Sequence, residues 1–272
     1  MRHCKQTTIS GDAFRYLRSL TFLDMRFCKE TTIGDEAVRQ LVNLRDLTMW
    51  GCEQTTISDN AFHNFSDLRS LNMTSCRQTT ITDNAFQHLT TLQSLVMKGC
   101  NQTTITDDAF RHLGNLQYLD MLGCNQGTIT DNAFQHLRNL QHLTMSKCNQ
   151  EMITNNAFRH LTSLVSLNMG ECYQVTITDA AFKHFKNTRY LDMQACCQET
   201  ITHDAFRHLS NLESLIIAGC EQTTIGDNSF QHLSNMRFLN MIHCPQETIT
   251  DNGFRHLTNL QSLAMIAVIR QP

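Results

Sequence analysis

Cysteine is the most reactive residue type that recurs in this sequence, and eleven of its twelve cysteines follow one another at intervals of 24 residues. This spacing puts one thiol on each turn of a repeating coil, so the thiols form a column. Coils that stack as neighbouring strands do lie about 4.8 Å apart, whereas the Cβ atoms of a disulfide lie about 3.8 Å apart. The sequence therefore predicts an exposed thiol at Cys197 and buried, reduced thiols at Cys4, Cys28, Cys52, Cys76, Cys100, Cys124, Cys148, Cys172, Cys196, Cys220 and Cys244.

Histidine forms a second column, and its neutral imidazole is a common metal ligand. A metal site needs three or four ligands that converge on one point, while one histidine per coil gives a spaced row. The sequence also has no HExxH motif and no CxxC pair. We therefore expect no metal site, and solvent-facing histidines at His88, His112, His136, His160, His184, His208, His232 and His256.

Catalysis is not indicated by the remaining polar residues, because almost all of them belong to repeated columns. An active site gathers unlike groups once, and the sequence has no GxSxG, P-loop or GxGxxG motif. We therefore predict a protein that is not an enzyme and that has no cofactor.

The elements that position these columns follow from a single repeat. Leu119 and Met121 alternate as a short strand with one buried face should, and Cys124 follows where the chain must turn. Thr130 is a favoured helix N-cap, and Phe134 lies four residues later, where a buried side chain anchors the first helical turn. Each coil is therefore expected to be a short strand, a tight turn, a brief helix and a polar return.

A fixed period of 20 to 50 residues is typical of a solenoid, in which each unit buries its apolar face only against its neighbours. The period here is unbroken, and no linker rich in proline, glycine or serine interrupts it. We therefore predict one domain over residues 1–272, made of about eleven 24-residue repeats.

The pattern Leu-x-x-Leu-x-Met-x-x-Cys, followed by Ile, Phe and Leu, resembles the 24-residue class of the leucine-rich repeat family over the whole chain. Cysteine stands at the family's asparagine position and is similar to that of the cysteine-containing subclass. The repeat sequence CxQTTITDNAFxHLxNLQxL is also similar to tandem arrays in large DNA viruses of amoebae. The resemblance implies an α/β horseshoe solenoid with a parallel β-sheet on the concave face and short helices on the convex face. It also assigns to each cysteine the asparagine's hydrogen bonds to the turn backbone.

Glutamine recurs where the family buries a leucine, for example at Gln78 and Gln102. If these amides are buried, each must find hydrogen-bond partners or cost about 1–3 kcal/mol. Stacked amides could bond from coil to coil, as glutamine ladders do in stacked sheets. The alternative turns each glutamine outward and fills the gap with threonine. We favour the inward arrangement.

Charge and hydropathy narrow the classes of partner. The 22 Lys and Arg against 25 Asp and Glu give a formal net charge of -3. This lacks the excess of positive charge that is typical of proteins that bind nucleic acid. No apolar run approaches the roughly 20 residues that cross a bilayer, and the first residues lack the apolar core of a secretory signal. We therefore expect a cytoplasmic protein that binds neither membrane nor nucleic acid.

A binding surface is the function that the variation between copies favours. The core columns hardly change, whereas the strand positions beside them vary, and strand alternation points those positions away from the core. Neutral drift of exposed positions is the alternative. In leucine-rich repeats this concave face commonly grips a protein partner, and the residue types enriched at such contacts single out Asp24, Arg26, Trp50, Lys98, Tyr118, Asp120, Asp192 and Gln194.

Two other functions stay open. The ends of the repeat array carry no recognisable cap, and unpaired strand edges are templates for pairing with another chain. Residues Ala264, Ile266 and Val268 would then support end-to-end association, as a dimer or a filament. An adaptor subunit of a ubiquitin-ligase-like complex is suggested only by the likeness to the cysteine-containing subclass.

Overall fold

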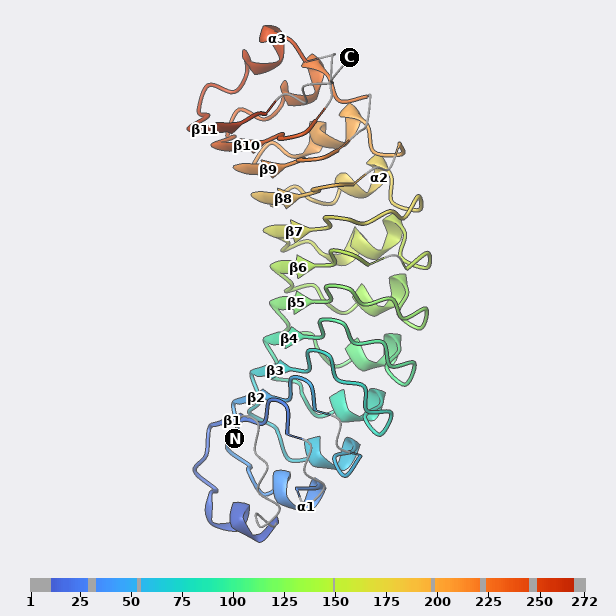
Figure 1. The fold of residues 1–272 in the computed structure, drawn as a ribbon, viewed down its shortest axis with the longest axis vertical. Helices are drawn as coiled ribbons and strands as arrows, with labels where there is room; N and C mark the ends of the chain where they lie inside the picture. Colours follow the sequence, from blue (N-terminus) through green and yellow to red (C-terminus); the bar gives the residue numbers. More distant parts are fainter. Residues whose placement is uncertain are drawn as a thin grey trace. The chain divides into compact units, whose positions relative to one another are not determined.

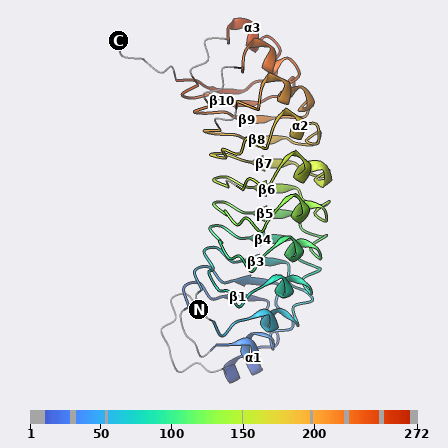
Figure 2. The same ribbon diagram turned by 90° about the vertical axis from the view of Figure 1, so that its right-hand side faces the viewer.

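Each 24-residue repeat folds into one coil that contains a three-residue strand, a turn, a single turn of helix and a return segment (Figure 1). The computed structural model describes residues 11–28, 33–52, 55–148, 150–196, 199–220, 224–244 and 249–266. The chain divides into two compact units, Met1–Leu140 and Gln141–Pro272. In each of them the strands form one parallel sheet, and the helical turns lie on the opposite side of the coils (Figure 2).

The strands pair in a register of 24 residues, so that each strand leucine faces the leucine of the next coil, as Leu95 faces Leu119. In the first unit the strands are β1 (Phe22–Asp24), β2 (Asp46–Thr48), β3 (Ser70–Asn72), β4 (Ser94–Val96) and β5 (Tyr118–Asp120). In the second unit they are β6 (His142–Thr144), β7 (Ser166–Asn168), β8 (Tyr190–Asp192), β9 (Ser214–Ile216), β10 (Phe238–Asn240) and β11 (Ser262–Ala264).

The helical segments are shorter than a normal helix, and most of them are 3₁₀ rather than α. In the first unit they are η1 (Gly11–Tyr16), α1 (Asp35–Val38), η2 (Asp59–Phe62), η3 (Asp83–Phe86), η4 (Asp107–Phe110) and η5 (Asp131–Phe134). In the second unit they are η6 (Asn155–His160), α2 (Asp179–Phe182), η7 (His203–His208), η8 (Asp227–Phe230) and α3 (Asp251–Phe254). The predicted coil of strand, turn, brief helix and return is confirmed.

The core consists of the apolar columns that the sequence predicts. In the coil that contains β4, the side chains of Leu95, Met97, Cys100, Ile105 and Phe110 are all inaccessible to solvent. The same columns are buried in the neighbouring coils of each unit, so every coil shields the one before it. The predicted α/β repeat solenoid, with its parallel sheet on one side and short helices on the other, is confirmed for each unit.

The N-cap of each helical turn also joins two coils. The Thr106 hydroxyl accepts a hydrogen bond from the Asp108 backbone N–H at 3.3 Å, which caps η4 as predicted. Asp83 of the preceding coil accepts the Thr106 backbone N–H and its hydroxyl, both at 2.7 Å. The same paired contact joins Asp59 to Thr82, with distances of 2.7 and 2.6 Å. The helix-start carboxylate therefore links coils, a role that the sequence analysis did not assign.

The cysteine column donates to backbone carbonyls. The Cys100 thiol lies 2.9 Å from the carbonyl oxygen of Met73, and the Cys124 thiol lies 2.8 Å from that of Met97. In the second unit the Cys196 thiol makes the same contact with Met169 at 2.9 Å. No disulfide joins the cysteines of the described residues, and thiols such as that of Cys100 make the backbone hydrogen bond that the resemblance gives to asparagine. Cys4 and Cys197 lie outside the described residues.

The glutamine column points inward. Gln78, Gln102, Gln126, Gln150 and Gln174 are at most 4% exposed. The bond between coils differs from an amide-to-amide ladder, because the Gln102 Nε2 donates to the backbone carbonyl of Gln78 at 3.3 Å. Burial is therefore confirmed for these five glutamines, and the acceptor is the main chain for Gln102 and Gln126. The predicted disturbance at Glu30 lies outside the described residues.

Candidate functional site

The surface that varies most from coil to coil lies over the strands. Each coil places three positions on it: the first and third residues of the strand, and the second residue after the strand. We call this surface, described for each unit by itself, the exposed sheet face. In the coil of β5 these three residues are Tyr118, Asp120 and Leu122.

The first cluster on the exposed sheet face surrounds Trp50 in the first unit. Trp50 is 37% exposed. The strand pattern predicts it in the middle of a strand, but it lies in the turn just after β2. The Arg26 guanidinium lies 5.9 Å from the centroid of its ring, and the Phe27 ring lies at 5.3 Å. Arg26 is in turn held by Asp24 at 2.7 Å. Three of the predicted residues, Asp24, Arg26 and Trp50, are therefore brought together.

The second cluster joins β4 to β5. The Lys98 ammonium lies 3.0 Å from the Asp120 carboxylate, and the Tyr118 hydroxyl donates to the same oxygen of Asp120 at 3.2 Å. The Asp120 side chain is only 2% exposed. Burial and the nearby Asp120 charge raise the pKa of Tyr118. Three further predicted residues, Lys98, Tyr118 and Asp120, therefore form one contact group, although the carboxylate itself is covered.

The third-position aspartates and asparagines have a local role that sequence reasoning missed. Oδ1 of Asp24 accepts the Arg26 backbone N–H at 3.1 Å, and Oδ1 of Asp120 accepts that of Leu122 at 3.1 Å. Asn72 makes the same contact with Thr74 at 2.9 Å. Such bonds are typical of Asx turns, and the recurrence of Asp or Asn in this column was the available signal. These side chains therefore shape the strand ends as well as facing the surface.

The predicted residues of the second unit, Asp192 and Gln194, lie at the end of β8. Oδ1 of Asp192 accepts the Gln194 backbone N–H at 3.0 Å, and Oδ2 accepts Asn168 Nδ2 at 3.1 Å. The Tyr190 hydroxyl lies 3.5 Å from the same Oδ2. Burial raises the pKa of Asp192. Gln194 is exposed.

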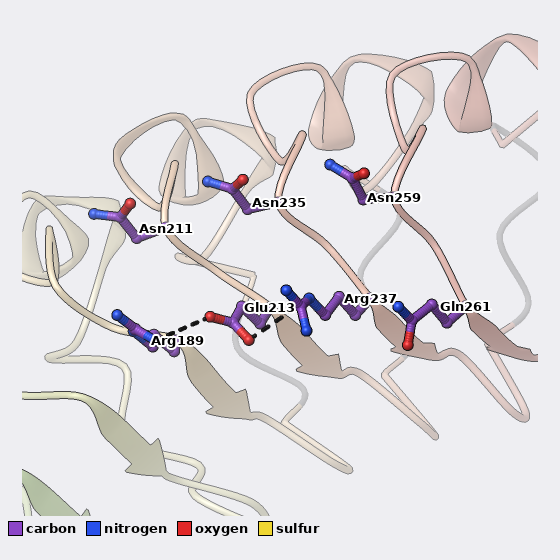
Figure 3. Close-up of a pocket in the computed structure, with 7 residues that line it drawn as sticks. All are labelled: Arg189, Asn211, Glu213, Asn235, Arg237, Asn259 and Gln261. Atoms are coloured by element: carbon purple, nitrogen blue, oxygen red, sulfur yellow. Dashed lines mark hydrogen bonds and ion pairs between the residues drawn. The ribbon is translucent and has the colours of Figure 1, made fainter.

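A polar hollow in the second unit was not predicted (Figure 3). Glu213 lies between two arginines, 3.2 Å from Arg189 and 3.9 Å from Arg237. Above them, the amides of Asn211, Asn235 and Asn259 donate to backbone carbonyls of the preceding coils at 2.8–2.9 Å. These residues lie just before each strand. Their charges could be read from the sequence, but the sequence did not show that they come together in one hollow.

The histidine row faces solvent on the helical side. His88, His112, His136 and His232 are exposed, and the others of the row are partly exposed. Within the described residues, no three His, Cys, Asp or Glu side chains are grouped so that they could hold a metal ion.

The apolar residues proposed for end-to-end association lie at and after β11. Ala264 is half-buried, and Ile266 is 57% exposed beside Met265 at 52%. Val268 lies outside the described residues.

No helix in the described part of the chain is long and apolar enough to cross a membrane.

A sequence model described as "BspA type Leucine rich repeat region" matches residues 7–141 and 127–261, with six copies. A search of curated proteins finds no match. Among solved structures, a leucine-rich-repeat protein of Leptospira interrogans is 20% identical, with a TM-score of 0.78, over 93% of this chain and 62% of that one.

Two receptor structures share the fold as well. TLR13, solved in complex with the RNA ssRNA13, is 23% identical with a TM-score of 0.67, over 93% of this chain and 40% of that one. Drosophila Toll, solved in complex with Spatzle, is 17% identical with a TM-score of 0.65, over 97% of this chain and 42% of that one. This chain therefore spans less than two thirds of each of these proteins, and at these identities the likeness shows the fold alone.

Proposed function

Because the chain belongs to the BspA-type leucine-rich-repeat family, we propose that it is a non-enzymatic scaffold that binds a protein partner through its exposed sheet face. The fold commonly mediates protein–protein interaction. One solved relative holds an RNA and another a protein, so the fold does not choose between these partners. The net charge of -3 favours the protein.

The observation that carries this proposal is the Trp50 cluster. A tryptophan that keeps 37% of its surface exposed while an arginine and a phenylalanine hold its ring is a preorganised aromatic anchor. Tryptophan and arginine dominate measured binding hot spots, and a held side chain loses little entropy on binding. Phe22, 55% exposed in β1, adds a second aromatic ring to the exposed sheet face of the same unit.

The test is affinity capture of a partner from a lysate by the wild type, followed by measurement of its dissociation constant. Trp50→Ala should weaken binding at least tenfold, which is the scale of a hot spot. Tyr16→Ala is the matched control, because Tyr16 is an exposed aromatic residue of the same unit outside the sheet face. Equal affinity for Trp50→Ala and wild type would refute the proposed site. A large loss of stability in Trp50→Ala would instead show that Trp50 is a packing residue.

We propose self-association as a second candidate, favoured by the apolar exposure around β11. Leu263, Met265 and Ile266 are each at least 43% exposed, and an exposed apolar patch favours contact with another chain. Analytical ultracentrifugation of the wild type should show association that depends on concentration and that Ile266→Lys reduces. A stable monomer at all concentrations would contradict this candidate. The adaptor alternative has no comparable observation in its favour.

A further inference from the structure

The sequence Tyr-Leu-Asp-Met occurs twice, at residues 118–121 in β5 and at residues 190–193 in β8. The two copies fold alike. In both, Oδ1 of the aspartate accepts the backbone N–H two residues later, at 3.1 Å for Asp120 and 3.0 Å for Asp192. In both, the tyrosine hydroxyl approaches Oδ2, at 3.2 Å from Tyr118 and 3.5 Å from Tyr190. In each copy the tyrosine hydroxyl therefore lies next to the same carboxylate oxygen, Oδ2, at the end of the strand.

The two copies differ in what faces that oxygen. Lys98, which precedes Asp120 by 22 residues, places its ammonium 3.0 Å from Oδ2 of Asp120. The residue that precedes Asp192 by 22 is Gly170. A Cβ atom built on Gly170 would lie 3.6 Å from Oδ1 of Asp192, so a side chain at this position starts beside the carboxylate. The glycine therefore leaves the place of the lysine without a side chain.

No other base within the described residues takes that place, since none pairs with Asp192. Two bases of the second unit that lie on the strand side are engaged elsewhere: Lys147 with Glu171 at 3.3 Å and Arg189 with Glu213 at 3.2 Å. The other predicted sheet-face aspartate, Asp24, has its own partner in Arg26. Asp192 thus receives hydrogen bonds from neutral groups only, while burial raises its pKa. It bears the cost of partial burial without the ion pair that the equivalent carboxylate has.

We propose that Asp192 binds the ammonium group of a lysine side chain of the protein partner. Tyr190 lies beside the carboxylate, and Gly170 of the preceding coil leaves room for the ammonium. This inference rests on the proposed function and names one chemical feature of the partner. Lys98 is the template, because it supplies an ammonium to the same motif from the same position. A calcium ion fits less well, since it takes six to eight oxygen ligands including several carboxylates, and the site has one carboxylate.

The first experiment transplants the template. In Gly170→Lys, the new ammonium should pair with Asp192 and lower its pKa relative to the wild type. In Gly170→Met, a control of similar length without charge, the pKa should not fall. The pKa is measured from the ¹³C resonance of the Asp192 carboxyl group during a pH titration, after the amide spectrum has shown that each variant is folded. An Asp192 pKa that is the same in the lysine and methionine variants would overturn the proposal.

The second experiment uses the wild-type protein and therefore does not depend on whether a variant folds. n-Butylammonium chloride, added at low ionic strength where surface ion pairs are least screened, should shift the Asp192 carboxyl resonance and the Gly170 and Gln194 amides. n-Butanol should leave them in place, and Asp192→Asn or Gly170→Lys should abolish the response. A response that persists in Asp192→Asn, or one that calcium chloride reproduces at lower concentration, would overturn the ammonium assignment.

These outcomes are independent of the test of function, because the probe involves no protein partner. A protein that binds its partner through Trp50 but shows no butylammonium response keeps the proposed function and loses this inference. A protein that shows the response but no partner contact at the sheet face loses the proposed function and keeps only an ammonium site at Asp192.

Discussion

At the residue scale, the cysteine column shows how one side chain can serve both packing and hydrogen bonding. A cysteine thiol is small and apolar enough for full burial and still donates to a carbonyl of the preceding coil, as Cys100 does to Met73. Burial raises the pKa of Cys52, Cys100 and Cys172 from 9.0 to about 12. The column and its burial could be predicted from spacing alone. The acceptor could not, because it depends on how far each coil is offset from the next.

The raised thiol pKa values predict instability in alkali. A thiol that binds its proton more tightly in the folded state contributes stability that is complete below the unfolded pKa. That contribution is lost as the pH rises through the folded pKa. The urea midpoint should therefore fall between pH 9.0 and about 12. Cys100→Ala should cost about 0.5–1.5 kcal/mol at neutral pH, because it removes one hydrogen bond to the Met73 carbonyl, which keeps the Cys76 backbone N–H as a donor at 2.9 Å, and Cys100→Ser should cost less. A midpoint that does not change with alkaline pH would contradict this account.

A second residue-scale prediction concerns the position before each cysteine, which has a positive φ in every described coil that contains it. Ala195 has φ 53° and Gly219, in the next coil, has φ 68°. Because a left-handed conformation costs an L-residue roughly 1–2 kcal/mol, Ala195→Gly should stabilise the protein by about 1 kcal/mol. Gly219→Ala should cost about as much, since its added Cβ would have no neighbour closer than 3.9 Å. Destabilisation by Ala195→Gly, or no cost of Gly219→Ala, in chemical denaturation would contradict the assignment of strain.

At the element scale, an aspartate that begins a helical turn contacts the N-cap threonine of the following coil, as Asp83 contacts Thr106. The sequence predicted the threonine cap but not this contact. The threonine cap was expected from local propensity, while the carboxylate's second partner lies 23 residues away. Variation within the chain agrees with the contact. In the coil where His203 stands in place of the aspartate, the next N-cap position holds Gly226 instead of threonine. The Gly226 backbone N–H donates instead to the Ser229 hydroxyl oxygen at 3.0 Å. Both partners therefore change together.

A double-mutant cycle measures this contact. Asp83→Ala and Thr106→Ala should show a coupling of roughly 0.5–3 kcal/mol in the free energy of unfolding, as residues that share hydrogen bonds do. His203→Ala is the control, because its coil lacks the carboxylate, and it should change stability by no more than about 0.5 kcal/mol. Additive effects of Asp83→Ala and Thr106→Ala would show that the two hydrogen bonds do not hold the coils together.

At the scale of the whole molecule, the period of 24 residues was enough to predict strand order, register and the core columns, because each coil contacts mainly its neighbours. The candidate site was less predictable. The exposure of Trp50 followed from strand alternation, but the burial of Asp120 under Lys98 and Tyr118 depends on side chains from two coils. The single domain over residues 1–272 stays a prediction, because the chain divides into two compact units.

The central claim, that a protein partner covers the exposed sheet face, is tested most directly by hydroxyl-radical footprinting of the protein with and without its captured partner. Oxidation of Phe22 and Trp50, which lie on that face in the first unit, should decrease in the complex. Oxidation of His88 and His112, exposed on the helical side, should stay unchanged. Protection of the histidines with unchanged oxidation of Trp50 would contradict the account.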